Sequence, residues 1–213
     1  MRDNLAATLR LMLVTDDALA TGRDLVALCR QSVAGGVTVV QLRLKRAQDH
    51  ELLVVARELM AVLTVPLIIN DRVDVALAAG AAGVHLGPDD LAPTLARRIV
   101  PPGFVIGASV GDDREVSRAE VADYWGIGPL HASRTKPDAG NGLELVGCSA
   151  LQRRAGGRPC LVIGGVLPLD VGGAIRAGFW GVAVASGILN GRETESAQRY
   201  AAALMATRTG NGQ

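Results

Sequence analysis

The stretch from Pro66 to Leu86 reads PLIINDRVDVALAAGAAGVHL and contains the unit on which the fold depends. Its two short runs, Pro66–Ile69 and Gly83–Leu86, are apolar at nearly every position, which is typical of strands buried on both faces of a parallel sheet. Between them lies a segment of helical length that ends near Gly80, and glycine is the usual residue just past a helix. The stretch therefore predicts a strand, a helix and a second, parallel strand.

The same unit recurs along the chain. Further apolar runs, each followed by a segment with helical spacing, are found at Leu11–Val14, Val37–Leu42, Phe104–Ala108, Tyr124–Ile127, Pro159–Ile163 and Trp180–Val184. Glycines precede several of these runs, at Gly35-Gly36, Gly156-Gly157 and Gly178.

Eight units within 213 residues, without a linker, predict one domain that is a (β/α)₈ TIM barrel. We expect the barrel at about 11–205 and a frayed tail at 207–213. An open doubly wound sheet is the alternative, but no G-x-G-x-x-G follows the first run.

Composition excludes several classes of protein. The chain has 22 Lys+Arg and 21 Asp+Glu, a net charge of +1, and only two each of Trp, Tyr and Phe. Without a basic cluster or stacking aromatics we expect no nucleic-acid partner. The charge-free stretches are too short to cross a membrane as helices, and the N-terminus lacks the basic region of a signal peptide. We therefore expect a cytoplasmic protein without a membrane partner; a homo-oligomer is left open.

The three cysteines lack the spacing of a zinc site or of a disulfide framework. Cys29, Cys148 and Cys160 stand alone in the sequence. We predict that they are small buried hydrophobic residues.

Polar residues follow the apolar runs, where a barrel of this kind has its active site. Alternation directs Gln41, Arg43 and Lys45 to one side, which indicates an anion site. Asp71 and Asp90 follow the next two runs, and carboxylates on adjacent strand ends hold Mg²⁺ when phosphate oxygens complete its shell. The alternative is that each Asp caps a helix.

The later strand ends add further candidates. Ser109 follows the fifth run and either contacts a ligand or caps the next helix. A long polar loop follows the sixth run and is predicted to be functional because loops of that length usually are. Gly165 and Ser186 follow the last two runs, where barrels commonly bind phosphate through backbone N–H groups. We expect His85 to pack inside the barrel rather than to bind a metal.

A count of charges limits which kind of ligand the site can bind. If the two Asp residues neutralise one Mg²⁺, then Arg43, Lys45 and Lys136 leave about three positive charges, roughly what an ionised diphosphate monoester requires. A second phosphate would then lie at the Gly165 end. The pattern predicts a site for one diphosphate and one monophosphate.

These motifs, in this order, resemble the thiamine-phosphate synthase family over roughly residues 11–205. The family patterns Q-x-R-x-K, I-N-D-R-V-D-x-A-L and G-V-H-L-G-x-x-D occur at 41–45, 69–77 and 83–90. Its G-x-S, its A-D-Y-x-x-x-G-P with a T-x-T-K-type loop, and its I-G-G followed by a hydrophobic residue occur at 107–109, 122–136 and 163–166. Ser133 stands in place of the first Thr of that loop and keeps the hydroxyl.

The resemblance implies a transferase of thiamine biosynthesis with one Mg²⁺ per active site. It would join 4-amino-2-methyl-5-(diphosphooxymethyl)pyrimidine to 4-methyl-5-(2-phosphooxyethyl)thiazole, or to its carboxylated form, giving thiamine phosphate and diphosphate. We expect a dissociative reaction in which cationic side chains stabilise the departing diphosphate, and no side-chain nucleophile or general base is required.

The resemblance also implies residue roles. Asp71 and Asp90 would hold the metal. The catalytic residues would be Arg43, Lys45, Ser109 and Lys136. The substrate-binding residues would be Gln41, Leu42, Arg43, Leu44, Lys45, Asn70, Ser109, Ser133, Arg134, Thr135, Lys136, Gly165, Ala185 and Ser186.

Three other functions compete with this one. A thiazole tautomerase on the same barrel would need a proton-transfer group, for which His131 is available, but would not need Asp71, Asp90 and Lys136. A Schiff-base aldolase would need a lysine in the sixth strand, which has none. A non-catalytic phosphate-binding barrel would be expected to have lost metal or diphosphate residues.

Overall fold

A computed structural model describes residues 5–132 and 142–209 of the chain. In this part of the chain, eight parallel strands close into a barrel in sequence order, since β1 pairs with both β2 and β8. The strands are β1 (Leu11–Val14), β2 (Val39–Leu42), β3 (Leu67–Asn70), β4 (Gly83–Leu86), β5 (Val105–Val110), β6 (Tyr124–Ile127), β7 (Cys160–Ile163) and β8 (Gly181–Val184). The predicted TIM barrel is confirmed, and the open sheet is wrong.

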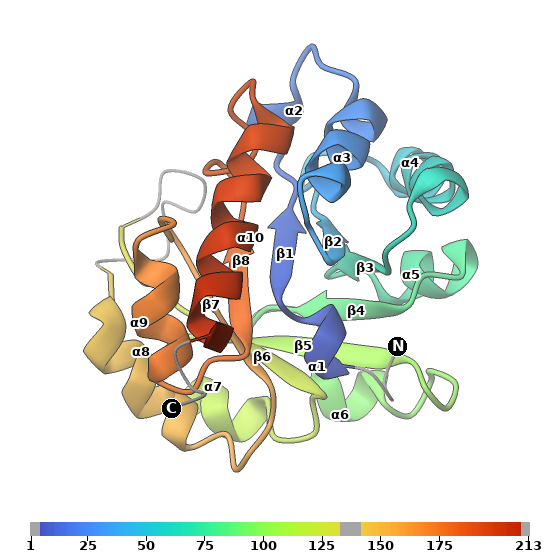
Figure 1. Cartoon of the computed structure of the whole chain (residues 1–213). Helices are drawn as coiled ribbons and strands as arrows, with labels where there is room; N and C mark the ends of the chain where they lie inside the picture. The colour runs from blue at the N-terminus through green and yellow to red at the C-terminus, as the bar shows by residue number, and fades with distance from the viewer. Residues whose placement is uncertain (1–4, 133–141, 210–213) are drawn as a thin grey trace.

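Helices follow the strands and surround the barrel (Figure 1). They are α3 (Leu25–Ala34), α4 (Asp49–Val62), α5 (Val73–Ala79), α6 (Pro93–Ala96), α7 (Asp113–Arg118), α8 (Glu144–Arg153), α9 (Asp170–Arg176) and α10 (Glu193–Thr209). Two short helices, α1 (Leu5–Thr8) and α2 (Asp17–Ala20), flank β1. The last helix, α10, packs on both α3 and α9 and so completes the outer ring (Figure 1).

Two hydrophobic clusters follow from the alternation of side chains along the strands. The larger cluster lies between the strands and the helices, and the smaller one fills the barrel interior. Leu9, directly after α1, belongs to the interior cluster, and Leu5, in α1, packs against it, so the two fill the end of the barrel where the strands begin. The opposite end, where the strands finish, is left for the polar residues.

Gly80 and Gly35 end helices before strands as predicted, for two physical reasons, whereas α8 ends at Arg153 with Arg154 as its cap, ahead of Gly156-Gly157. Gly80 caps α5 with φ 72°, in the left-handed region that glycine adopts without steric cost. Gly35 caps α3 with φ −83°, which any residue can adopt, but a Cβ there would lie 2.4 Å from the carbonyl oxygen of Thr194. The second glycine is required by close packing of α3 against α10.

Several element limits differ from the predicted ones by a few residues, and three of the differences bear on the site or on the end of the chain. β5 runs to Val110, so Ser109 lies inside a strand rather than after it. β3 includes Asn70 as its last residue. Residues 207–209 continue α10, where the sequence predicted a frayed tail, because the buried Leu204 anchors the last turns. Residues 210–213 lie outside the described residues.

The cysteines are free and buried, as predicted, at Cys29, Cys148 and Cys160. Among the described helices, none has the length and apolar character that a membrane span requires.

Candidate active site

A cavity of about 680 Å³ opens at the ends of the strands. The predicted site residues that line it are Gln41, Arg43, Lys45, Asn70, Asp71, Asp90, Ser109, Gly165, Ala185 and Ser186. Strands and loops far apart in the sequence are thus brought together around one space. The remaining loop candidates, Ser133, Arg134, Thr135 and Lys136, lie outside the described residues.

Two predicted substrate-binding side chains point elsewhere. Leu42 is fully buried in the layer between barrel and helices, and Leu44 packs against the same layer. Alternation along the strand turns Gln41 and Arg43 inward, so Leu42 between them and Leu44 after them face outward. The side chains of Leu42 and Leu44 therefore face away from the cavity, and the predicted role of these residues in substrate binding is left to their backbone groups.

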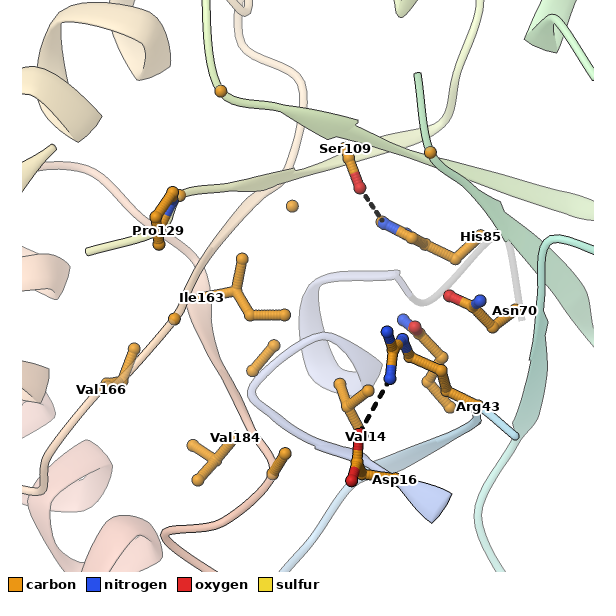
Figure 2. Close-up of a pocket in the computed structure, with 18 of the residues that line it drawn as sticks. Val14, Asp16, Arg43, Asn70, His85, Ser109, Pro129, Ile163, Val166 and Val184 are labelled. Atoms are coloured by element: carbon orange, nitrogen blue, oxygen red, sulfur yellow. Dashed lines mark hydrogen bonds and ion pairs between the residues drawn. The ribbon is translucent and has the colours of Figure 1, made fainter. Parts of the chain in front are cut away.

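The cavity has a polar side and an apolar side (Figure 2). Polar groups from β2, β3, β4 and β5 gather at one side, and the opposite wall is formed by Pro129, Ile163, Val166 and Val184. A ligand with a charged group and a flat apolar ring fits this division.

Asp71 and Asp90 meet at the polar side. Asp71 has a left-handed backbone, φ 64°, and its N–H donates to the carbonyl of His85 at 2.8 Å, which ties the loop after β3 to β4. Its carboxylate forms an ion pair with Lys45 and shares a hydrogen bond with Asp90. A left-handed aspartate costs about 1 kcal/mol or more, so neighbouring contacts must hold it in place.

The two carboxyl groups titrate as a pair. Burial, followed by the hydrogen bond with Asp90, raises the pKa of Asp71 to about 6 despite the opposing effect of Lys45. The pKa of Asp90 is lowered: its burial acts against this, but hydrogen bonds from Asp71 and from the N–H of Gly87 outweigh it. One proton held between two adjacent carboxyl groups is the expected result.

This donor set fits Mg²⁺ when a ligand completes the shell. Carboxylate oxygens are the ligands that Mg²⁺ prefers, and it usually binds one or two of them together with water and phosphate oxygens. In residues 5–132 and 142–209 no group of three or more His, Cys, Asp or Glu is arranged to hold a metal alone. Phosphate oxygens of a ligand would therefore be needed.

The alternative that Asp71, Asp90 and Ser109 each cap a helix is wrong. Arg72 and Ala92 occupy the N-cap positions of α5 and α6, and Asp112 occupies that of α7. Asp71, Asp90 and Ser109 cap none of the described helices, and all three line the cavity.

Arg118 on α7 holds the loop that carries Asp90. Its guanidinium donates to the carbonyl of Gly87 at 3.0 Å and also to the carbonyl of Asp90. The Asp90 carboxylate in turn accepts from the N–H of Gly87 at 2.7 Å. Sequence analysis missed Arg118, since nothing local links α7 to the loop after β4.

Thr15 and Asp16, after β1, hold the loop after β2 and were also missed. The Thr15 hydroxyl accepts from the N–H of Arg43 at 2.8 Å and donates to its carbonyl at 3.1 Å. Asp16 accepts from the Arg43 guanidinium at 3.0 Å and caps α2 through the N–H of Ala18 (Figure 2). The signal was available, because Thr15-Asp16-Asp17 directly follows a strand.

The charge of the cavity wall differs from the sequence-based count. The described cations of the wall are Arg43 and Lys45, whereas its carboxylates are Asp16, Asp71, Asp89, Asp90, Asp112 and Glu115. Sequence spacing does not show that the loops after β1 and β5 turn acidic residues toward the cavity. In this part of the chain an anionic ligand therefore needs added positive charge, such as a divalent cation.

Backbone N–H groups form the opposite end of the cavity. Gly165, with φ 63°, and Ser186-Gly187 line it after β7 and β8. Within the described chain, the N–H groups of these three residues donate no hydrogen bond. Unsatisfied N–H groups that face a cavity are suited to bind an anion.

The two histidines near the site have different surroundings. His85 is buried inside the barrel, as predicted, and hydrogen-bonds Ser109 and Tyr124. His131 instead pairs with Asp170 at 2.9 Å and does not line the cavity. The histidine that a tautomerase would use for proton transfer is thus paired with Asp170 and is not among the described residues of the cavity wall.

Residues 11–188 match the family described as thiamine monophosphate synthase. The thiamine-phosphate synthase of Methanoculleus marisnigri is 44% identical over 89% of this chain and 92% of its own length. That of Xanthobacter autotrophicus is 44% identical over 94% of this chain and 97% of its own length.

Solved structures agree with the sequence relatives. A thiamine phosphate pyrophosphorylase from Pyrococcus furiosus superimposes with a TM-score of 0.85 at 28% identity, covering 96% of this chain and 99% of that one. A 3-hexulose-6-phosphate synthase, at 19% identity and a TM-score of 0.69, covers 92% of this chain and 99% of its own and shares the fold alone. The chain therefore belongs to the thiamine monophosphate synthase family and, like its curated members, is a transferase.

Proposed function

We propose that the protein condenses 4-amino-2-methyl-5-(diphosphooxymethyl)pyrimidine with 4-methyl-5-(2-phosphooxyethyl)thiazole to thiamine phosphate and diphosphate. The carboxylated form of the thiazole would give the same two products and also release its carboxyl group as CO₂. One observation carries the proposal: a single cavity has paired carboxylates beside cations at one end and unsatisfied N–H groups at the other. These two ends fit a metal-bound diphosphate and a monophosphate. The names of the relatives support the same reaction.

Asp71 and Asp90 are the proposed ligands of one Mg²⁺, which when bound would neutralise charge on the diphosphate. Lys45 would leave Asp71 and donate to a diphosphate oxygen, and Arg43 would remain oriented by Asp16. Asn70 and Gln41 line the same side of the cavity. Lys136 is proposed to add a further cation, although it lies outside the described residues.

The proposed reaction breaks the bond between the pyrimidine methylene carbon and the diphosphate oxygen, whose electron pair leaves with the diphosphate. The thiazole nitrogen then uses its lone pair to form the new C–N bond. No proton transfer is needed, so the site requires positioning and electrostatics rather than a base. Ile163 and Val184, on the apolar wall, would shield the cationic pyrimidine from water.

The second substrate would bind with its phosphate at Gly165, Ala185 and Ser186. Ser133, Arg134 and Thr135 are proposed to complete this end. An apolar wall next to N–H donors suits a ring that carries a phosphate on a short arm.

The proposal is tested by incubating purified protein with both substrates, with Mg²⁺ or with EDTA. Thiamine phosphate is detected by mass, and diphosphate release is measured in parallel. We expect metal-dependent formation of equal amounts of both products. Isomerisation of the thiazole alone would replace the proposal by a tautomerase, and binding without product would replace it by a phosphate sensor.

A matched pair of variants links activity to the site. Asp90→Asn should abolish metal-dependent product formation. Glu58→Gln, a similar carboxylate-to-amide change at an exposed position on α4, should leave it unchanged. Equal activity in both variants would remove Asp90 from the proposed metal site.

A further inference from the structure

Tyr124, His85 and Ser109 form a connected chain of hydrogen bonds across β6, β4 and β5. The Tyr124 hydroxyl lies 3.0 Å from Nδ1 of His85. Nε2 of the same ring lies 3.1 Å from the Ser109 hydroxyl, as Figure 2 shows. Tyr124 is fully buried, whereas Ser109 lines the cavity. The chain therefore leads from the sealed interior of the barrel to the ligand space.

Two glycines leave room for the rings of this chain. A Cβ at Gly107 would lie 2.2 Å from the Tyr124 ring, and one at Gly126 would lie 3.1 Å from Cε1 of His85. The ring centroids are 5.5 Å apart at an angle of 36°. Since interior side chains pack closely, the rings have one well-defined position relative to Ser109.

The direction of the hydrogen bonds follows from the burial of Tyr124. Burial, with the nearby charge of Asp123, raises the pKa of the Tyr124 hydroxyl, which therefore keeps its proton. Within the described chain, Nδ1 of His85 is its one hydrogen-bond partner. A buried hydroxyl that donated to nothing would lose the free energy of a hydrogen bond, so Tyr124 donates to Nδ1.

The direction of the second hydrogen bond, between His85 and Ser109, is then determined. With Nδ1 as acceptor, the neutral His85 ring carries its proton on Nε2 and donates to the Ser109 oxygen. That bond leaves the Ser109 hydrogen for another acceptor. No other hydrogen bond of the Ser109 side chain exists among residues 5–132 and 142–209, and the cavity is where its acceptor can lie.

We propose that Tyr124 and His85 are positioning residues that present the Ser109 hydroxyl to the ligand as a hydrogen-bond donor. The ligand atom that contacts Ser109 is then an acceptor, either a diphosphate oxygen or an unprotonated ring nitrogen. The identity of that ligand rests on the proposed function; the direction of the chain does not.

The direction is tested first without any ligand. The chain has three histidines, so ¹⁵N NMR of the histidine rings can be assigned with His50→Gln and His131→Gln. We expect His85 to be protonated at Nε2 and unprotonated at Nδ1, and Tyr124→Phe to abolish this preference. Tyr200→Phe removes the other tyrosine hydroxyl, which bonds the carbonyl of Val166, and should not alter His85. A wild-type His85 protonated at Nδ1 would overturn the proposal, whether or not the variant folds and whatever the reaction is.

The consequence for binding is tested by a double-mutant cycle. Affinity for the pyrimidine diphosphate and for inorganic diphosphate, each with Mg²⁺, is measured by calorimetry in wild type, Tyr124→Phe, Ser109→Ala and the double variant. We expect Tyr124→Phe to weaken binding of the pyrimidine diphosphate about 3- to 10-fold, because Ser109 can then donate to His85 instead. In the Ser109→Ala background the same change should have no effect.

Each outcome has a defined meaning. Weaker binding of both ligands supports a diphosphate oxygen as the acceptor, and weaker binding of the pyrimidine diphosphate alone supports a ring nitrogen. An equal effect of Tyr124→Phe with and without Ser109 would show a merely structural role and overturn the proposal. If neither ligand binds the wild type, the proposed function fails, while the NMR result still decides the direction of the chain.

Discussion

The ammonium group of Lys45 forms an ion pair with the carboxylate of Asp71, which joins the end of β2 to the loop after β3. Asp71 is also one of the two proposed metal ligands. A metal and Lys45 therefore compete for the same carboxylate. Metal binding would release the ammonium group toward the phosphate oxygens of a ligand, so that the metal and the cation act in sequence.

Lys45→Ala should slow the chemical step without weakening metal binding. The variant loses a cation that is proposed to stabilise the departing diphosphate, and removal of one such group typically costs about 100-fold in rate. Single-turnover product formation, with enzyme in excess of the pyrimidine diphosphate, measures this step. Lys136→Ala, in the part of the loop that is not described, should act in the same direction.

The matched control for Lys45 is Arg46→Ala, an exposed neighbouring cation that does not line the cavity. It should leave the single-turnover rate unchanged. Unaltered rates in both lysine variants would contradict an electrostatic role for these residues.

Metal affinity should depend on pH near 6. Because the pKa of Asp71 is raised to about 6, below that pH a metal must displace a proton from the carboxyl pair. We expect Mg²⁺ affinity to fall by up to about tenfold per pH unit below this value and to be constant above about pH 7. Calorimetry with Mg²⁺ across this range, in buffers of different ionisation enthalpy, measures both the affinity and the released proton.

The raised pKa of Asp71 also predicts how the stability of the metal-free protein changes with pH. The folded state holds the Asp71 proton more tightly than the unfolded chain does, so this group stabilises the metal-free protein as pH falls from about 6 toward 4. Asp71→Asn should remove both this effect and the proton release. Metal affinity that is equal at pH 5 and pH 7 in the wild type would refute the proposal that Asp71, with its raised pKa, is a metal ligand.

Arg118→Gln should weaken metal binding, because Arg118 holds the backbone of the loop that carries Asp90, a proposed metal ligand. Loss of its bonds to the carbonyls of Gly87 and Asp90 would free the loop that orients the Asp90 carboxylate. Loss of such supporting contacts typically costs about 10-fold or more in metal affinity. Titration with Mn²⁺, followed by electron paramagnetic resonance, measures the free metal directly.

Two further variants separate orientation from folding. Arg118→Lys, which can still donate to one carbonyl, should recover part of the affinity. Arg114→Gln, an exposed arginine on the same helix, should have no effect. An Arg118→Gln variant with wild-type Mn²⁺ affinity would show that the loop is held without this side chain.

The three cysteines should resist alkylation in the native protein. Burial raises the pKa of Cys29 and Cys160 to about 12 and that of Cys148 to about 11, so thiolate is scarce at pH 8. Iodoacetamide labelling read by intact mass should give no modification in native buffer and complete modification of all three thiols in denaturant. Rapid labelling of a native thiol would contradict the described packing of that residue.

The sequence by itself determined the barrel and a set of polar residues that line one cavity. Short apolar runs separated by helical segments and glycine can bury both strand faces only in a helix-covered parallel sheet. In such a sheet the carboxyl ends of the strands lie at one edge. The polar residues that follow each run, such as Arg43, Asp71 and Ser186, are therefore assigned to one site by the order of the chain alone.

The tertiary structure alone decided how these residues are held and which of them are turned away. Leu42 faces the helices because side chains alternate between the two faces of β2. The bond from Arg118 to the loop after β4 spans 31 positions in sequence, and that between Asp16 and Arg43 spans 27. Whether such pairs meet depends on strand register and loop path. Those are set by the closure of the whole barrel rather than by any local stretch of chain.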